Sequence, residues 1–310
     1  MSFSHTSVLL NETIDALKVK PDGVYADCTL GGGGHAAALL SKLTTGRLIA
    51  LDQDGEALEA AKERLAPYGD KITFVHENFE HVGEVLKELA PDGIDGAMMD
   101  LGVSSHQLDT PQRGFSYHTD APLDMRMDQN GPRTAKDVVN GAGEVELSRI
   151  LRDFGEEKNA RRIAQAIVKA RAVKEIETTA ELAAIIKSAF RERDLIGEKH
   201  PARRSFQAIR IEVNRELEVI PRAIDGLVPA LRPGGRLAII TFHSLEDRLV
   251  KESFRKYSDG CTCPPDFPIC VCGFVKTLEP VTSKPILPTQ EEIDRNPRSR
   301  SAKLRVAEKL

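Results

Sequence analysis

Acidic residues end three apolar runs of this 310-residue chain. Asp27 follows "GVYA", Asp52 follows "GRLIAL" and Asp100 follows "GIDGAMM". A carboxylate can accept the hydrogen bonds of a ribose diol, attract a cation, or hold a reacting amine in place. If the runs are parallel strands, their carboxyl ends meet at the edge where open α/β sheets bind ligands. Asp100 has a plainer alternative, since Asp often caps the element that follows it.

A run of four glycines, residues 31–34, lies between the first two of these acids and precedes the alanine-rich stretch "HAAALLSKL". Glycine lacks a Cβ, so the loop can turn sharply and a ligand can lie against its main chain. A flexible connection is the alternative, but such a turn rarely needs more than one or two glycines. A strand, a glycine turn and a helix together predict a nucleotide-sized site.

Two adenosine-containing ligands fit this loop, NAD and S-adenosylmethionine (SAM). Gly31, Gly33 and Ala36 satisfy the dinucleotide pattern G-x-G-x-x-A. Asp52 follows roughly 20 residues later, where NAD enzymes and SAM enzymes both place an acid that binds ribose. Asp27 favours SAM, because its carboxylate attracts the cationic methionyl end and repels a diphosphate. The loop predicts an adenosine ligand and favours SAM.

The composition is that of a soluble globular protein, with 41% hydrophobic and 29% charged residues. The net charge of −4 does not suggest general polyanion binding, so a face that binds nucleic acid must be local. The sequence has no run of about 18 apolar residues, and "MSFSHTSVLL" lacks the features of a signal peptide. We expect a cytoplasmic enzyme without a membrane partner.

Strand and helix signals alternate up to about residue 105, which is typical of a parallel sheet with crossover helices. The pattern then becomes polar and afterwards purely helical, and the alternation resumes near residue 205. The segments "GFVKTLEPV" and "RSAKLRVAEKL" predict an antiparallel strand pair at the sheet edge. We expect an α/β fold of the Rossmann-like, SAM-dependent methyltransferase type, with a seven-stranded sheet and an antiparallel edge. Residues 1–109 and 205–310 would form this domain, and residues 110–204 an inserted helical domain.

Four of the five cysteines, Cys261, Cys263, Cys270 and Cys272, lie in "CTCPPDFPICVC"; the fifth, Cys28, precedes the glycine loop. Two C-x-C pairs could hold zinc, but structural zinc sites usually use wider C-x₂₋₄-C pairs. We expect reduced thiols in a proline-stiffened loop, and no metal that folding requires.

Longer motifs resemble one known family. They are "HTSVLL", "GGGGH", "DLGVSSHQLD", "RGFSY", "PLDMRM", "HPARRSFQAIRIEVN", "FHSLEDR" and "NPRSRSAKLRV". From His5 onward, the chain closely resembles the bacterial 16S ribosomal RNA (cytosine-N4)-methyltransferases, the RsmH or MraW family. The resemblance implies methylation by SAM of the exocyclic N4 of one cytosine in the decoding region, position 1402 in the usual ribosomal RNA numbering. It also implies an inserted helical domain that helps to hold RNA.

The same resemblance implies where the ligands bind. The implied SAM contacts are Gly33, Gly34, His35, Asp52, Phe79 beside the adenine, and Asp100 and Gln107 near the methionyl end. The implied partner is 16S ribosomal RNA within the 30S subunit, and the oligomeric state stays open between monomer and homodimer.

Asp100 is the predicted catalytic residue. The N4 lone pair of cytosine is delocalised into the ring, so a fixed acceptor must bind the amine and orient it toward the methyl donor. DNA amino-methyltransferases commonly have D-P-P-Y at this place, whereas this chain has Asp-Leu-Gly-Val. Phe115, Tyr117 and Phe242 are candidates to stack on the target base, with core packing as the alternative for each.

Basic residues are in excess between positions 126 and 215, with 19 Lys and Arg against 14 Asp and Glu. The candidate RNA-binding residues are Arg203, Arg204 and Arg210, with Lys199 beside them, and Arg298 and Arg300 near the C-terminal end. Arginine binds phosphate through two parallel hydrogen bonds. Basic residues scattered over solvated helices are the alternative.

Two other functions compete with an RNA methyltransferase. One is an NAD-dependent oxidoreductase, because of the glycine pattern. The other is a SAM-binding regulatory or assembly protein without turnover, against which Asp100 and "FHSLEDR" argue, since a pure binder needs only the loop and the ribose acid.

Overall fold

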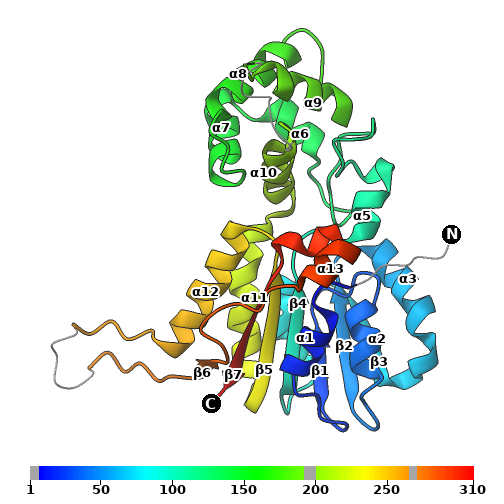
Figure 1. Ribbon diagram of the computed structural model, residues 1–310, viewed down its shortest axis with the longest axis vertical. Helices are drawn as coiled ribbons and strands as arrows, with labels where there is room; N and C mark the ends of the chain where they lie inside the picture. The colour runs from blue at the N-terminus through cyan, green and yellow to red at the C-terminus, as the bar shows by residue number, and fades with distance from the viewer. Residues whose placement is uncertain (1–6, 192–199, 265–270) are drawn as a thin grey trace. The chain divides into compact units, whose positions relative to one another are not determined.

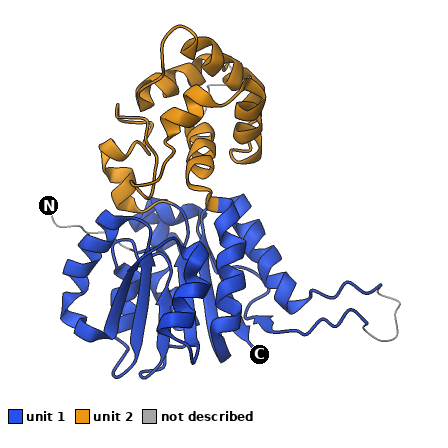
Figure 2. Cartoon of the chain, turned by 180° about the vertical axis from the view of Figure 1, so that it is seen from behind, with its two compact units in different colours: residues 1–102, 217–310 blue, residues 103–216 orange. Residues whose placement is uncertain are grey.

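The computed structural model describes residues 7–191, 200–264 and 271–310. The chain divides into two compact units, shown in Figure 2. Unit 1 comprises Met1–Gly102 and Leu217–Leu310, and unit 2 comprises Val103–Glu216. Unit 2 is longer at both ends than the insert expected at 110–204, because Leu108 and Val213 pack against its core.

Unit 1 alternates strands and helices, as the sequence predicts. Its elements before unit 2 are α1 (Leu10–Ala16), β1 (Val24–Asp27), α2 (Gly34–Leu40), β2 (Arg47–Asp52), α3 (Gly55–Leu65), η1 (Ala66–Lys71), β3 (Ile72–His76), η2 (Phe79–His81), α4 (Val82–Leu89) and β4 (Ile94–Asp100). After unit 2 come α11 (Glu216–Ala230), β5 (Leu231–Thr241), α12 (Ser244–Ser258), β6 (Leu278–Pro280), α13 (Gln290–Arg295), η5 (Pro297–Ser301) and β7 (Lys303–Lys309).

The strands form one seven-stranded sheet in the order β3-β2-β1-β4-β5-β7-β6 (Figure 1). The five neighbouring strands β3, β2, β1, β4 and β5 pair in parallel. Strand β7 pairs antiparallel with both β5 and β6. The predicted seven-stranded sheet with an antiparallel edge is confirmed.

Hydrophobic residues cover both faces of this sheet. In β2, Leu48 and Ala50 belong to a core cluster with α1, α2 and α3, whereas Ile49 and Leu51 belong to a second cluster with α4, α11 and α12. Side chains alternate between the faces of a strand, so a strand covered on both sides is a continuous apolar run. This is why the runs that end in the three acids contain almost no polar residues.

Unit 2 is helical and has its own core. Its elements are α5 (Ser105–Asp109), η3 (Pro111–Arg113), α6 (Ala135–Gly141), α7 (Glu144–Asp153), α8 (Ala160–Arg171), α9 (Thr179–Ser188) and α10 (Arg203–Asn214). Capping boxes start three of these helices, at Ser104, Thr134 and Thr178. Within the described parts of the chain, no helix has the length and apolar character needed to cross a bilayer.

Candidate active site

The carboxyl edge of the sheet in unit 1 contains a topological switch point. From β1 the chain builds β2 and β3 on one side, and it later starts β4 on the other side of β1. Asp27 ends β1 and Asp100 ends β4, and these two strands are paired. Open α/β sheets bind ligands outside the carboxyl ends of their strands at such a point. The fold therefore brings two of the predicted acids to the place where a ligand is expected.

The glycine loop follows β1 and begins α2. Gly31 and Gly33 have φ angles of +49° and +72°, a left-handed conformation that favours glycine. Gly34 packs closely, because a Cβ at this position would overlap the Oγ of Ser7 unless that side chain moved. The loop thus depends on its glycines for conformation and for close packing.

Asp52 ends β2 and fixes this loop. Its Oδ2 accepts a hydrogen bond from the Gly31 N–H at 2.7 Å, and its Oδ1 accepts one from the Asp54 N–H at 2.8 Å. Burial raises the pKa of Asp52 to about 6, and the two hydrogen bonds oppose that rise. Each carboxylate oxygen has a further lone pair, so this immobilised group can accept hydrogen bonds from two ribose hydroxyls.

Phe79 lies just after β3, the strand paired with β2. Asp52 is opposite His76 in this pairing, three residues before Phe79. Asn78 caps η2 and also donates from Nδ2 to Gln53 Oε1 at 2.7 Å, which ties the two strand ends together. The half-buried ring of Phe79 therefore lies at the same edge as Asp52, as the predicted adenine contact requires.

Two carboxylate oxygens at this edge are buried without a hydrogen-bond partner among the described residues, Asp27 Oδ2 and Asp100 Oδ1. Burial raises the pKa of Asp27 to about 7, opposed by a hydrogen bond from the Thr29 N–H and assisted by the charge of Asp52. Burial also raises the pKa of Asp100 to about 8, with further contributions from the charges of Asp27 and Glu246. Each acid therefore has one buried oxygen without a hydrogen bond that would stabilise its charged form.

His35 lies beside Asp100. Its Nε2 is 3.0 Å from the carbonyl oxygen of Val8, which can only accept, so Nε2 carries the hydrogen. Its Nδ1 lies 3.8 Å from Asp100 Oδ2. This contact places His35 beside Asp100, and its role as a SAM contact stays a prediction.

Two other residues at this edge, Thr29 and Glu246, have no role predicted from the sequence. Thr29 Oγ1 accepts a hydrogen bond from the Asp100 N–H at 2.6 Å, which joins the segment before the glycine loop to the end of β4. Glu246 is buried, accepts the Phe242 N–H at 2.7 Å and forms a capping box with His243 at the start of α12. The available signal for Glu246 was the H-S-L-E spacing within "FHSLEDR", which matches a capping box.

The acids at this edge fit a cationic ligand. Asp27, Asp52 and Asp100 have pKa values raised to about 7, 6 and 8, which means that ionising them costs free energy in the protein alone. A positive charge beside them would lower these pKa values and balance the two buried oxygens. SAM carries a sulfonium and an ammonium group, whereas the diphosphate of NAD would add negative charge. The residues therefore fit SAM and disfavour NAD.

Gln107, the remaining predicted SAM contact, belongs to unit 2. Its Oε1 accepts the Ser104 N–H at 3.0 Å as part of the capping box of α5. Its predicted place near the methionyl end stays a prediction.

The three aromatic candidates have different surroundings. Phe115 is buried in the core of unit 2, which is the packing alternative. Tyr117 stacks on His200, with ring centroids 4.6 Å apart. Phe242 follows β5 directly and is half-buried. It lies close to Gly102, and Gly102 is two residues after Asp100 in the chain. Of the three, Phe242 is the one that unit 1 holds next to its acids.

The predicted RNA-binding arginines also separate into two groups. Arg203 and Arg204 are exposed in the first turn of α10, and Arg298 and Arg300 are exposed in η5. Arg210 departs from the expected phosphate role, because its Nε and Nη2 donate to Glu216 at 2.8 Å each and both side chains are largely buried. Its guanidinium is committed to a carboxylate within unit 2. Lys199 lies outside the described residues.

The model of the MraW methylase family matches residues 2–310. The chain belongs to the MraW methylase family. Relatives named "Ribosomal RNA small subunit methyltransferase H" match along nearly their whole length. The protein from Symbiobacterium thermophilum is 56% identical over 100% of this chain and 98% of its own. The protein from Brevibacillus brevis is 52% identical over 100% of this chain and 99% of its own. The protein from Paenibacillus sp. is 55% identical over 99% of this chain and 100% of its own.

Membership of the MraW methylase family confirms the family resemblance and the prediction that the chain is a methyltransferase. It also agrees with SAM as the cofactor, which the acids of unit 1 favour by their charge. Both competing functions, an NAD-dependent oxidoreductase and a SAM-binding protein without turnover, are set aside.

Proposed function

We propose that this chain transfers a methyl group from SAM to the exocyclic N4 of a cytosine in 16S ribosomal RNA of the small subunit. The observation that carries the proposal is the full-length similarity, at 52–56% identity, to proteins named for methylation of small-subunit ribosomal RNA. The choice of N4 of cytosine rests on the motif resemblance and on the partnerless oxygen of Asp100.

Residues of unit 1 hold the cofactor in this proposal. The glycine loop with Gly33 and Gly34 lies along it, Asp52 binds the ribose, and Phe79 contacts the adenine. Asp27 and Asp100 balance the positive charge of the methionyl end. When bound, SAM supplies an electrophilic methyl group.

Asp100 acts on the amino group of the base. An acceptor that binds N4–H favours the pyramidal form of the amine and orients its lone pair. Adding a methyl group obliges N4 to lose one proton, and the Asp100 carboxylate, which accepts N4–H, is placed to take it. The hydrogen bond from the Asp100 N–H to Thr29 Oγ1 keeps the end of β4 in position, and His35 Nδ1 lies 3.8 Å from Asp100 Oδ2.

Unit 2 contributes to RNA binding in this proposal. Arg203 and Arg204 are adjacent and exposed at the start of α10, where both can pair with phosphate. Arg298 and Arg300 offer a second pair of exposed guanidinium groups in unit 1. We expect the substrate to be RNA within the 30S subunit, so 30S particles and free 16S RNA are separate arms of the experiment.

Single-turnover methylation separates the two roles. Asp100→Asn keeps the shape of the side chain but removes its charge, so the rate at saturating RNA should fall by about 10²-fold or more. The double variant Arg203→Ala and Arg204→Ala should lose RNA affinity, with a shallower dependence on salt than wild type, and recover its rate at saturating RNA. Arg161→Ala with Arg162→Ala, an exposed pair on α8, is the matched control.

The identity of the methylated nucleoside tests which base and which of its atoms receive the methyl group. Mass spectrometry of nucleosides from the methylated RNA should show N4-methylcytidine, and a ring-methylated cytidine would contradict the assignment of Asp100. If the Asp100 variant recovers at saturating RNA as the arginine variant does, Asp100 is a binding residue and the proposed chemistry fails.

A further inference from the structure

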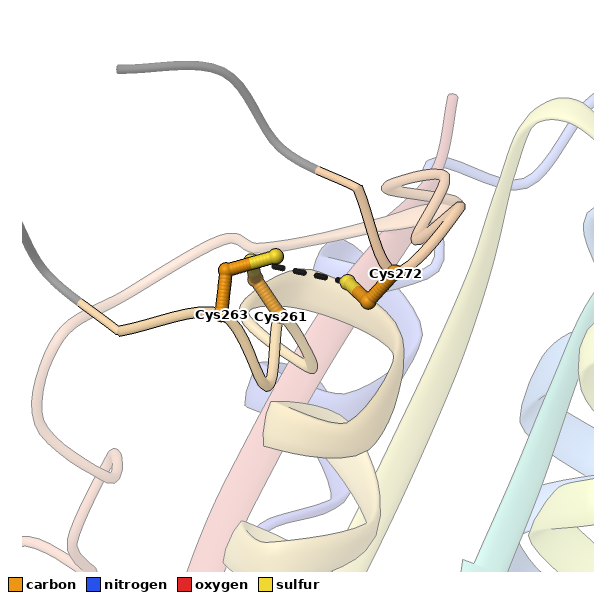
Figure 3. A group of neighbouring side chains, drawn as sticks. All are labelled: Cys261, Cys263 and Cys272. Atoms are coloured by element: carbon orange, nitrogen blue, oxygen red, sulfur yellow. Dashed lines mark hydrogen bonds between the residues drawn. The ribbon is translucent and has the colours of Figure 1, made fainter. Parts of the chain in front are cut away.

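Three cysteine side chains converge at the base of the long loop between α12 and β6. Cys261 and Cys263 follow α12, and Cys272 lies on the returning arm of the loop (Figure 1). Their sulfur atoms all lie within 4.8 Å of one another, and the Sγ atoms of Cys261 and Cys272 are 3.6 Å apart. Figure 3 shows the side chains turned toward one another from the two arms.

The Sγ atoms of Cys261 and Cys272, which share a hydrogen bond, are too far apart for a disulfide and lie at a distance compatible with a tetrahedral metal site. Zinc–thiolate bonds of about 2.3 Å in a tetrahedron place neighbouring sulfur atoms about 3.8 Å apart. A disulfide brings its sulfur atoms to about 2.05 Å. The observed 3.6 Å between Cys261 and Cys272 is close to the first value. The group therefore has the dimensions of a set of metal ligands.

A backbone hydrogen bond also orients one of the three sulfur atoms. The Val271 N–H donates to the Sγ of Cys263 at 3.2 Å. Backbone N–H groups that donate to sulfur orient it, as the outer contacts of metal ligands commonly do. Soft thiolates select zinc over hard cations such as magnesium or calcium.

We propose that Cys261, Cys263 and Cys272 bind a zinc ion that clips together the two arms of this loop. The spacing of the cysteines along the chain had argued against zinc, because C-x-C pairs are narrower than the usual pairs. In the structure the ligands come from two antiparallel arms, so their spacing along one segment is not the constraint.

The site is local and the fold of unit 1 does not depend on it. The Thr277 N–H donates to the carbonyl of Tyr257 at 2.9 Å, which closes the loop at its base, and Leu278 is buried in the core. The cysteines lie beyond this closure and are exposed or half-exposed. Loss of the metal should free the arms and leave the sheet intact.

The metal content of the untagged full-length protein, purified in reducing buffer, tests the proposal. Elemental analysis should find one zinc per chain. The triple variant Cys261→Ser, Cys263→Ser, Cys272→Ser should lose it, and Cys28→Ala, which changes a buried cysteine elsewhere in unit 1, should keep it. Cobalt substitution should give thiolate-to-cobalt charge-transfer absorption that the triple variant lacks.

Several results would overturn the proposal. They are zinc well below one per chain, zinc retained by the triple variant, or a disulfide among these cysteines in the freshly purified protein. A second measurement tests the clip. Chelation should speed chymotryptic cleavage at Phe274 several-fold while SAM affinity changes less than twofold. Global unfolding on chelation, or unchanged cleavage, would contradict a local clip.

Discussion

SAM should bind more tightly as the pH rises through the range in which Asp100 ionises. In the ligand-free protein the pKa of this acid is raised to about 8, so below that pH it is mostly protonated. A cationic ligand favours the ionised form, so binding at lower pH must first remove a proton. The contribution of Asp100 therefore has one sign: it makes the affinity for SAM fall as the pH falls.

The magnitude follows from that pKa. If Asp100 alone must ionise, the dissociation constant should rise about 25-fold between pH 8.5 and pH 6.5, or about 1.9 kcal/mol. Asp27, with a pKa of about 7, should steepen the dependence at the lower end. The ligand-free protein should show the opposite trend. Because both folded pKa values are raised, its free energy of unfolding should decrease as the pH rises from 6 to 8.5.

Isothermal titration calorimetry in buffers of different ionisation enthalpy measures both the affinity and the protons released. Adenosine, which has no sulfonium or ammonium group, is the matched control ligand and should bind with little pH dependence. Asp100→Asn should remove most of the dependence for SAM between pH 7 and 8.5. Equal pH dependence for SAM and adenosine, or constant SAM affinity over this range, would refute the electrostatic reasoning.

Three further predictions concern the loop and the RNA-binding arginines. Asp52→Ala should weaken SAM binding by about 1–3 kcal/mol in titration, because a charged acceptor is lost; unchanged affinity would remove the ribose assignment. Gly34→Ala should lower the melting temperature and SAM affinity because its Cβ overlaps Ser7 Oγ, and adding Ser7→Ala should restore much of both; no restoration would show that the overlap is not the cause. Filter binding at rising salt should show a shallower salt dependence for the Arg203→Ala, Arg204→Ala variant than for wild type, since two phosphate contacts are gone; an identical slope would place the RNA elsewhere.

Much of unit 1 could be predicted from sequence because its signals are local. A strand buried on both faces is an apolar run, and the acid that ends it marks the carboxyl edge of the sheet. The glycine run predicted a tight loop, and the φ angles of Gly31 and Gly33 show the conformation that requires it. These inferences need only neighbouring residues and the rules for parallel sheets.

What the sequence did not provide depends on contacts between distant residues. Arg210 looked like a phosphate ligand because its partner, Glu216, lies beyond the end of α10, where Arg215 has a left-handed φ of 53°. The influence of Glu246 on Asp100 requires β4 and β5 to be neighbours. Charge and spacing along the chain reveal neither contact.

Along the chain, unit 2 is inserted between β4 and β5, and this order has a consequence for synthesis on the ribosome. The strands that carry Asp27, Asp52 and Asp100 are complete once residue 100 has been made, but β5, the other neighbour of β4, begins only at Leu231. Until then one edge of β4 has no strand beside it, and α11 and α12 have not yet covered one face of the sheet. An uncovered apolar face and an open strand edge invite wrong association. The nascent chain should therefore need a chaperone most while unit 2 is being translated, and it should need it less once β5 has emerged.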